Sequence, residues 1–426
     1  MMDPMSGSTD SPLLPRVLQG RARRLAGLED FGPDVSRALE VFCGFFASVA
    51  LTPQGRANLA AHATQALVTR LRLTHALKGT PELFAVPLRA PIIIVGLPRT
   101  GTSYLHQLLS SLPKRRFLPF WEAREPIPDA RDDNRIPYYE HFAKLLTHSA
   151  PALAHQHPID VHGPEECLFL LDPSLVSLSF LWDAPCPGYF DWVHDARHEE
   201  PYRIYGQLLH YLQASAPEHR LVLKSPAHFG QLSALLRAVP EALLVHTHRD
   251  PLQALPSLCS LQETLHGTAI DNLDRKRIGR ETLRGLEFLT SRNTAQREQI
   301  SAESCFELHF DDLTLDPRAS VERIHQHFGL GWSAEDESAL RLELARGTPP
   351  QVGRHSATAT VWPTTASKLA RSQSACRATG HSGALLSHLV DMRGSPATEL
   401  PRQGVSEHPN RRPSRRESFS SDLLPS

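Results

Sequence analysis

A glycine-rich loop in the stretch G-L-P-R-T-G-T-S has the composition of an anion-binding site. Gly96 and Gly101 stand at the spacing of a P-loop and would let the backbone approach a ligand closely. Backbone N–H groups of such a loop, where it enters a helix, converge on phosphate or a similar anion. An ATPase or GTPase needs lysine directly after the second glycine, but Thr102 occupies this position. The loop therefore predicts an anionic group that is held without a metal triphosphate clamp.

The same loop supplies a cation and several hydroxyl groups. Arg99 lies inside it, and Thr100, Thr102 and Ser103 follow within four residues. A guanidinium can hold two oxygens of an anion with its planar fork. The alternative is a glycine turn that joins a strand to a helix and binds nothing.

Two further cations follow predicted strands in LVLKSPAHFGQLSALLRAVPEALLVHTHRDP. The pattern indicates strands at residues 221–224 and 242–248, joined by a helix at about residues 229–239. Strands joined by a helix are expected to be parallel, and ligands bind at the carboxyl ends of parallel strands. Lys224 and Arg249 come at these ends. Arg249 could equally form a capping ion pair at the helix that starts with Arg-Asp-Pro.

The elements that must position these residues predict an α/β fold: a P-loop-like parallel sheet flanked by helices, with an N-terminal helical segment. Residues 92–95 form a β-branched run suited to a buried parallel strand, and a helical leucine pattern follows the loop. Residues 115–215, rich in Pro, His and aromatic residues, form an insertion that could build an acceptor pocket. We expect four segments: disordered 1–15, a helical lobe at 16–88, the α/β domain at 89–355, and an atypical tail at 356–426.

Composition excludes several classes of protein. The 426 residues include 45 Lys plus Arg and 46 Asp plus Glu. With charges this balanced, we do not expect the protein as a whole to attract nucleic acid or a membrane surface electrostatically. Six cysteines without C-x-x-C pairing argue against a zinc site and a disulfide framework. The histidines are too scattered to predict a metal site. The N-terminus lacks an apolar signal core and no stretch approaches a membrane span, which predicts a soluble, cytoplasmic protein.

Taken together, these motifs resemble the sulfotransferases that use 3′-phosphoadenosine 5′-phosphosulfate (PAPS), in the bacterial-type branch with a PRTGT loop. Besides the loop, LVLKSPAH and VHTHRDPLQALPSLCSL, the similarity takes in LEDFG, FWEAREPIP and FDDLTLDPRASVERIHQHFGL. It covers about residues 25–355. The resemblance implies a sulfuryl transfer from PAPS to a hydroxyl of a small molecule, glycan or lipid, with no metal. Nothing in the sequence indicates the oligomeric state.

The resemblance also assigns roles to the binding residues. In that family the loop holds the 5′-phosphosulfate, so the resemblance assigns 5′-phosphosulfate binding to residues 99–103 of this chain. An Arg with a Ser eight residues later holds the 3′-phosphate, a spacing that Arg249 and Ser257 reproduce. Arg99 stands where the family has a lysine, and Lys224 would stabilise the sulfonate oxygens. Tyr104 occupies a position where cytosolic members carry an aromatic residue against adenine.

The general base is left open between several residues. His228 follows Lys224 by four residues, where related enzymes place a histidine base, but it could be a packing or capping histidine. Glu165 and Glu166 in HGPEECLFLL, with the nearby His162, are competing candidates, and Glu122 is a fourth. The two glutamates could equally be a helix N-terminal pair favoured by the helix dipole.

Two alternative functions remain beside the sulfotransferase. A P-loop nucleotide kinase or NTPase is disfavoured by Thr102 and by the lack of a convincing acidic strand for Mg²⁺ beyond Asp250. A non-catalytic nucleotide-binding relative is kept open by the C-terminus. There, relatives continue after a GRH with YSLxDYGL, whereas this chain reads SATATVWPTTASKLARSQSACR from residue 356. The tail is either natural and disordered or the product of a frameshift, which resequencing the coding DNA would decide.

Overall fold

The computed structural model describes residues 11–33, 35–129, 131–149, 151, 159–195 and 199–346. Contacts divide the chain into Met1–Ala366 and Ser367–Ser426, and all described residues belong to the first unit. The predicted tail at 356–426, including the possible frameshift, lies outside the described residues. Of the stretch expected to be disordered, residues 11–15 are described, and Leu13 is buried there.

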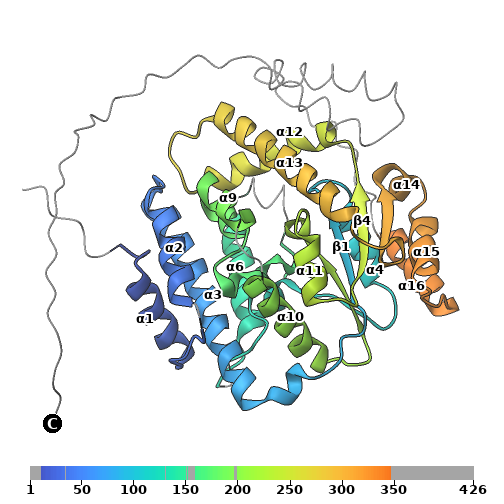
Figure 1. Cartoon of the computed structure of the whole chain (residues 1–426), viewed down its shortest axis with the longest axis horizontal. Helices are drawn as coiled ribbons and strands as arrows, with labels where there is room; N and C mark the ends of the chain where they lie inside the picture. The colour runs from blue at the N-terminus through green and yellow to red at the C-terminus, as the bar shows by residue number, and fades with distance from the viewer. Residues whose placement is uncertain are drawn as a thin grey trace, which may run out of the picture. The chain divides into compact units, whose positions relative to one another are not determined.

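Helices precede, separate and follow the strands along the chain (Figure 1). The α-helices are α1 (Pro15–Ala26), α2 (Val35–Ala47), α3 (Pro53–Gly79), α4 (Thr102–Ser110), α5 (Phe120–Arg124), α6 (Arg135–Ser149), α8 (Phe180–Asp183), α9 (Pro187–Asp195), α10 (Glu199–Ala214), α11 (Leu232–Ala238), α12 (Pro251–His266), α13 (Arg275–Arg297), α14 (Phe310–Leu315), α15 (Pro317–His327) and α16 (Ala334–Arg346). The 3₁₀ helices are η1 (Pro81–Phe84), η2 (Cys167–Ser174), η3 (Pro226–His228) and η4 (Ala302–Ser304).

One parallel sheet of five strands lies at the centre of the fold. The strands β1 (Ile92–Gly96), β2 (Arg115–Arg116), β3 (Arg220–Lys224), β4 (Leu243–His248) and β5 (Cys305–His309) pair in the order β2-β3-β1-β4-β5. In the register, Ile94 lies opposite Lys224 on one side and Gly96 opposite Thr247 on the other. The predicted α/β fold is therefore confirmed, and the carboxyl ends of β1, β3 and β4 meet at one edge.

Helices cover both faces of this sheet. Figure 1 shows α10 and α11 on one side of β1 and β4, and α4, α15 and α16 on the other. Alternation along β1 explains this: Ile92 and Ile94 pack with Leu105 of α4, whereas Ile93 and Val95 pack into the core formed with α10 and η2. Strands buried on both faces read as continuous apolar runs, as the sequence predicted.

The N-terminal segment is helical, as the predicted fold class includes. Helices α1, α2 and α3 bury a separate core that includes Leu18, Phe42 and Leu67 together with Tyr189 of α9. Thr52 starts α3, because its hydroxyl accepts a hydrogen bond from the Gly55 N–H at 2.9 Å. Among the described residues, no helix is both long and apolar enough to cross a lipid bilayer.

Candidate active site

The glycine-rich loop joins the end of β1 to the start of α4, as the sequence predicted. Gly101 precedes α4 with φ 87°, a left-handed conformation that favours glycine, and Arg99 also has a positive φ of 72°. A Cβ atom at Gly96 would lie 2.2 Å from Thr247 Oγ1, so only glycine fits beside β4. The loop is held in a conformation that aims the first N–H groups of α4 outward.

Its hydroxyl groups differ in what they can bind. Thr100 is buried, and its Oγ1 donates to the Leu97 carbonyl at 2.7 Å while lying 2.7 Å from Thr247 Oγ1. Thr102 is also buried, whereas Ser103 is exposed on the first turn of α4. The Thr100 hydroxyl therefore fastens the loop to β4, and Ser103 is the hydroxyl open to a ligand.

Two arginines converge beside this loop. Arg249 follows β4, and its Nη1 donates to the Arg99 carbonyl at 2.9 Å. Its Cζ lies 4.1 Å from the centroid of the Phe310 ring, and its Nε donates to Gln253 Oε1 at 3.2 Å. Burial and the neighbouring Arg99 charge lower the pKa of Arg249, although Asp311 and Asp250 oppose this shift. Within the described residues neither guanidinium forms an ion pair, so the positive charge of each is not paired with a carboxylate.

Ser257 and Tyr104 are the other residues predicted to contact the nucleotide. Ser257 lies in the second turn of α12 and is half-buried, downstream of Arg249 as the eight-residue spacing requires. Tyr104 is buried in the core on the α4 face of the sheet, where burial and Glu343 of α16 raise its pKa. Its predicted contact with adenine stays a prediction. The contact between Phe310 and Arg249 was not predicted from the sequence. The segment that begins at Phe310 served only as a sign of family resemblance, and no role was assigned to its residues.

A buried ion pair lies at the end of β3. Lys224 Nζ donates to Glu166 Oε1 at 2.7 Å, and the two residues are 3% and 9% exposed. Lys224 shares a face of the sheet with Val222, whose carbonyl lies 3.0 Å from His106 Nε2. The sequence predicted a role for both partners of the ion pair but did not predict that they touch, because 58 residues separate them.

Backbone hydrogen bonds hold Glu166 in this position. Glu165 N–H donates to the Leu118 carbonyl at 2.8 Å, next to a bridge between Pro119 and Pro164. Glu165 Oε1 in turn accepts the Glu166 N–H at 2.7 Å. Glu166 directly precedes η2, as the helix N-terminal alternative expected, yet its carboxylate binds Lys224.

His228 is fully buried, with both ring nitrogens engaged. Nδ1 lies 3.0 Å from the Tyr202 hydroxyl, and Nε2 lies 3.3 Å from Cys167 Sγ. Burial lowers the pKa of His228 to about 3. In this arrangement neither nitrogen can reach an acceptor hydroxyl, so a base role for His228 requires a rearrangement.

The remaining base candidates interact with other residues. Glu122 is bound by Arg116 Nη2 at 2.7 Å, and burial raises its pKa. His162 is exposed and lies 3.0 Å from Glu140 Oε1. Among the candidate bases, Glu166 is the carboxylate that the structure brings to the edge of the sheet where Lys224 lies.

Two histidines that seemed scattered in the sequence do come together with a carboxylate. His246 and His248 on β4 and Glu307 on β5 place ligand atoms within 4.8 Å of one another, a grouping that could hold a metal ion. However, Gly230 N–H donates to Asn293 Oδ1 at 3.2 Å, so Asn293 Nδ2 faces His246 Nε2 at 3.2 Å as a donor. His246 Nδ1 then carries its hydrogen toward Glu307, at 2.9 Å, instead of a lone pair for a metal. We therefore interpret the group as a hydrogen-bond network.

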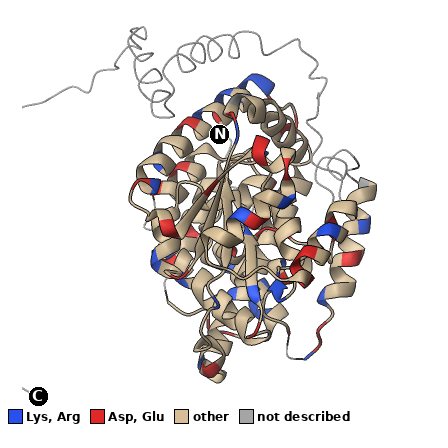
Figure 2. Cartoon of the chain, turned by 90° about the vertical axis from the view of Figure 1, so that its right-hand side faces the viewer, with Lys and Arg blue, Asp and Glu red and all other residues tan. Residues whose placement is uncertain are grey.

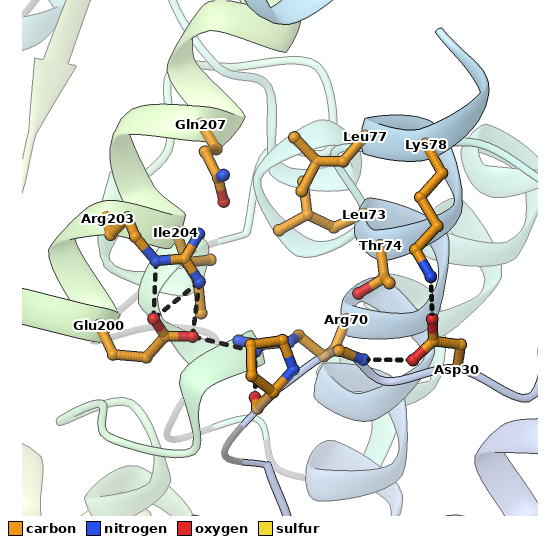
Figure 3. Close-up of a pocket in the computed structure, with 12 residues that line it drawn as sticks. Asp30, Arg70, Leu73, Thr74, Leu77, Lys78, Glu200, Arg203, Ile204 and Gln207 are labelled. Atoms are coloured by element: carbon orange, nitrogen blue, oxygen red, sulfur yellow. Dashed lines mark hydrogen bonds and ion pairs between the residues drawn. The ribbon is translucent and has the colours of Figure 1, made fainter. Parts of the chain in front are cut away.

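A hollow of about 610 Å³ lies away from the loop, between α3 and α10 (Figure 3). Its charged side chains bind one another: Arg70 and Arg203 both pair with Glu200, and Lys78 pairs with Asp30. Because these charges are neutralised locally, this hollow lacks the open cations that distinguish the loop. In Figure 2 the ribbon positions of Lys and Arg and those of Asp and Glu are interspersed, in keeping with the net charge of −1.

Comparison with known proteins shows which protein family this chain resembles. A model described as "Sulfotransferase family" matches residues 91–334, which include the loop, Glu166, Lys224 and Arg249. Two curated relatives, both named omega-hydroxy-beta-dihydromenaquinone-9 sulfotransferase Stf3, come from Mycobacterium bovis and Mycobacterium tuberculosis. Each is 28% identical over 256 residues, or 57% of this chain. The match spans 63% of the relatives' own length.

Solved structures show the same fold. Sulfotransferase STF9 from Mycobacterium avium is 27% identical, with a TM-score of 0.73 over 80% of this chain and 90% of its own. Sulfotransferase STF1 from Mycobacterium tuberculosis is 30% identical, with a TM-score of 0.67 over 80% of this chain and 98% of its own.

Proposed function

The chain belongs to the sulfotransferase family, and we propose that it transfers a sulfuryl group from PAPS to the hydroxyl group of an acceptor. The observation that carries this proposal is the convergence of Arg99 and Arg249 at the N-terminus of α4, with no ion pair to either within the described residues. Two open guanidinium groups beside a glycine-rich loop suit a nucleotide with anionic groups at both ends.

The residues present fit this donor. The N–H groups of Gly101, Thr102 and Ser103, with the Ser103 hydroxyl, would hold the 5′ end at the positive end of α4. Arg249 and Ser257 would hold the 3′-phosphate, with the Phe310 ring keeping the guanidinium in place. Bound there, the donor supplies an activated sulfuryl group. Arg99 would neutralise charge on the 5′-phosphate, and as a guanidinium it would keep its proton throughout.

Lys224 and Glu166 fit the two remaining tasks. Lys224 would stabilise negative charge on the sulfonate oxygens, and Glu166 would accept the proton of the acceptor hydroxyl. The acceptor oxygen would bond to sulfur as the bond between sulfur and the 5′-phosphate oxygen breaks, so that adenosine 3′,5′-bisphosphate leaves. In the ion pair each group masks the other. The hydrogen that Lys224 donates to Glu166 cannot be donated to a sulfonate oxygen at the same time. If Lys224 moves toward the sulfonate, the Glu166 carboxylate would therefore become free to accept a proton. We favour Glu166 over His228 because the imidazole is closed off by Tyr202 and Cys167.

Among small-molecule, glycan and lipid acceptors, we propose a lipid alcohol. The curated relatives are named for a hydroxylated menaquinone, which is a lipid. We further propose that the reaction needs no metal, because guanidinium groups take the place of the lysine and the Mg²⁺ ion of a P-loop NTPase.

Calorimetric titration with adenosine 3′,5′-bisphosphate tests the donor site. We expect binding that is unchanged by EDTA and is weakened in Arg249→Ala. Tight binding of ATP only with Mg²⁺ would instead indicate a kinase or NTPase. Binding of the bisphosphate without any turnover of PAPS would indicate a non-catalytic relative.

A further inference from the structure

Helix α6 presents an exposed apolar face. Of the seven large hydrophobic side chains that are exposed among the described residues, four lie on this helix. Tyr138 is 57% exposed, Phe142 38% and Leu145 55%. Spacings of four and three residues place these three side chains in one stripe along the helix. The concentration on a single helix distinguishes this face from isolated surface leucines elsewhere.

The opposite face of α6 explains how the helix is held. Tyr139 packs with Phe120 and Val161, and Ala143 lies against the same cluster. The Tyr139 hydroxyl also donates to Glu125 Oε1 at 3.2 Å. The helix thus has one anchored side, and Tyr138 and Leu145 of the stripe face outward. Phe142 lies at the boundary between the two sides, because its partly exposed ring also stacks on Phe120 with the centroids 6.2 Å apart.

The anchored side of α6 packs against the segment that leads to Glu166, the proposed general base. Val161 and Phe120 flank the bridge between Pro119 and Pro164, which directly precedes Glu165 and Glu166. Whatever binds the outer face of α6 is therefore separated from the segment carrying Glu166 by one packed layer.

The residues that border the stripe indicate what it fits. At 100° per residue, His141, Lys144 and His148 all fall on one flank of the stripe, and all three are exposed. Lys144 forms no ion pair within the part of the chain that the structure describes. A phenol, a phenyl ring and an isobutyl group beside a lysine and two imidazoles form the pattern of a helix lying in a lipid interface. There the apolar side chains enter the acyl boundary, and the cation and N–H donors contact phosphates.

We infer that the outer face of α6 docks on the surface of an anionic lipid bilayer. In addition, this contact presents a membrane-dissolved alcohol to the site beside Glu166, a step that rests on the proposed function. The helix lies along the surface and does not span it.

Flotation with lipid vesicles tests the docking. The full-length protein should bind vesicles of phosphatidylcholine mixed with phosphatidylglycerol, and should bind pure phosphatidylcholine more weakly. Replacing all three stripe residues (Tyr138→Ser, Phe142→Ser, Leu145→Ser) should lower the partition coefficient by about tenfold or more, because three apolar side chains leave the interface. Lys144→Glu should weaken binding to the anionic vesicles alone.

A control variant removes three exposed apolar side chains that lie elsewhere. Leu25, Leu315 and Leu342 are 58%, 87% and 60% exposed on α1, α14 and α16. Replacing these three with serine should leave vesicle binding unchanged. Equal loss in the two triple variants would overturn the inference, as would loss of a dimer on sedimentation of the stripe variant, which would make a second copy the occupant.

Separate readouts distinguish this inference from the proposed function. Turnover of a short, water-soluble alcohol should be the same in the stripe variant and the unchanged protein, while turnover of a vesicle-embedded alcohol should fall with vesicle binding. If the protein binds vesicles through α6 but transfers no sulfuryl group, the proposed function fails and the docking stands. If it transfers sulfuryl to both alcohols regardless of the stripe, the docking inference fails and the function stands.

Discussion

Lys224 at the end of β3 donates to Glu166 Oε1 at 2.7 Å, so a cation and a carboxylate with separate proposed tasks meet in one buried contact. The contact links the sheet to the inserted segment that precedes η2. A buried pair of this kind is costly to break from one side, and its stability and catalytic roles can be separated by substitution.

Glu166→Gln should abolish most of the turnover without removing the donor site. The amide keeps an oxygen for Lys224 but cannot accept a proton, so we expect the transfer rate to fall by about 10²- to 10⁴-fold. Affinity for adenosine 3′,5′-bisphosphate should stay within about twofold, because Arg249 and the loop are untouched. Single-turnover kinetics with calorimetry measures both. A fully active Glu166→Gln would return the base role to another residue.

Lys224→Met should destabilise the protein, and a second substitution should rescue it. Removal of the ammonium leaves the Glu166 carboxylate buried and unpaired, at a cost of about 3–5 kcal/mol in the free energy of unfolding. Lys224→Met combined with Glu166→Leu should recover most of this stability while remaining inactive. Urea unfolding of Lys224→Met, Glu166→Leu and the double variant measures the coupling. Additive losses in the double variant would contradict the pairing.

Arg249→Ala should weaken bisphosphate binding by about 10- to 100-fold, which corresponds to the loss of charged hydrogen bonds to one phosphate. Arg323→Ala is the matched control, because Arg323 also lies over an aromatic ring, at 5.6 Å from the Phe306 centroid. Isothermal titration of both variants compares them. Equal weakening in the two would show that a general loss of positive charge, and not the site, is responsible.

Gly96→Ala should disturb the loop. The new Cβ would lie 2.2 Å from Thr247 Oγ1 and 2.8 Å from the Thr247 carbonyl, so the strands must separate or the loop must move. Overpacking of this kind costs about 1–3 kcal/mol. Gly331→Ala, where a Cβ meets nothing within 4 Å, serves as the control. Thermal unfolding should separate the two variants, and a Gly96→Ala protein as stable as the control would contradict the close approach of β1 and β4.

His228 should make the protein sensitive to acid. Burial lowers its pKa in the folded state from the ordinary 6.5 to about 3, so the unfolded chain takes up a proton that the folded chain refuses. Its contribution to stability is complete above pH 6.5 and is lost as the pH falls toward 3. His228→Gln should reduce the slope of unfolding free energy against pH by up to about 1.4 kcal/mol per pH unit in this window. The exposed His219, changed to Gln, should leave the slope unaltered.

Local sequence patterns were sufficient to predict the three central strands and the loop, whereas the edge strands β2 and β5 were not predicted. The run at residues 92–95 and the two glycines of the loop describe β1 and the start of α4 because both depend on neighbouring residues alone. The positions of Lys224 and Arg249 at strand ends followed from the same reasoning, since parallel strands place their carboxyl ends together.

The contacts between distant segments could not be predicted in this way. Glu166 reaches Lys224 through irregular backbone held by Leu118, and no periodicity describes such a segment. The burial of His228 depends on Tyr202 and Cys167, which approach from other elements. One signal was overlooked: His246 and His248 are two residues apart on a strand, so they share a face.

The most direct test of the account is transfer of labelled sulfuryl from PAPS to a long-chain alcohol in the presence of EDTA. We expect a sulfate ester to form with the unchanged protein, at a rate at least about 100-fold lower with Glu166→Gln and, at a low PAPS concentration, about 10- to 100-fold lower with Arg249→Ala. Product formation that requires Mg²⁺, or that is equal in all three proteins, would contradict the assignment of this site as a metal-independent sulfotransferase centre.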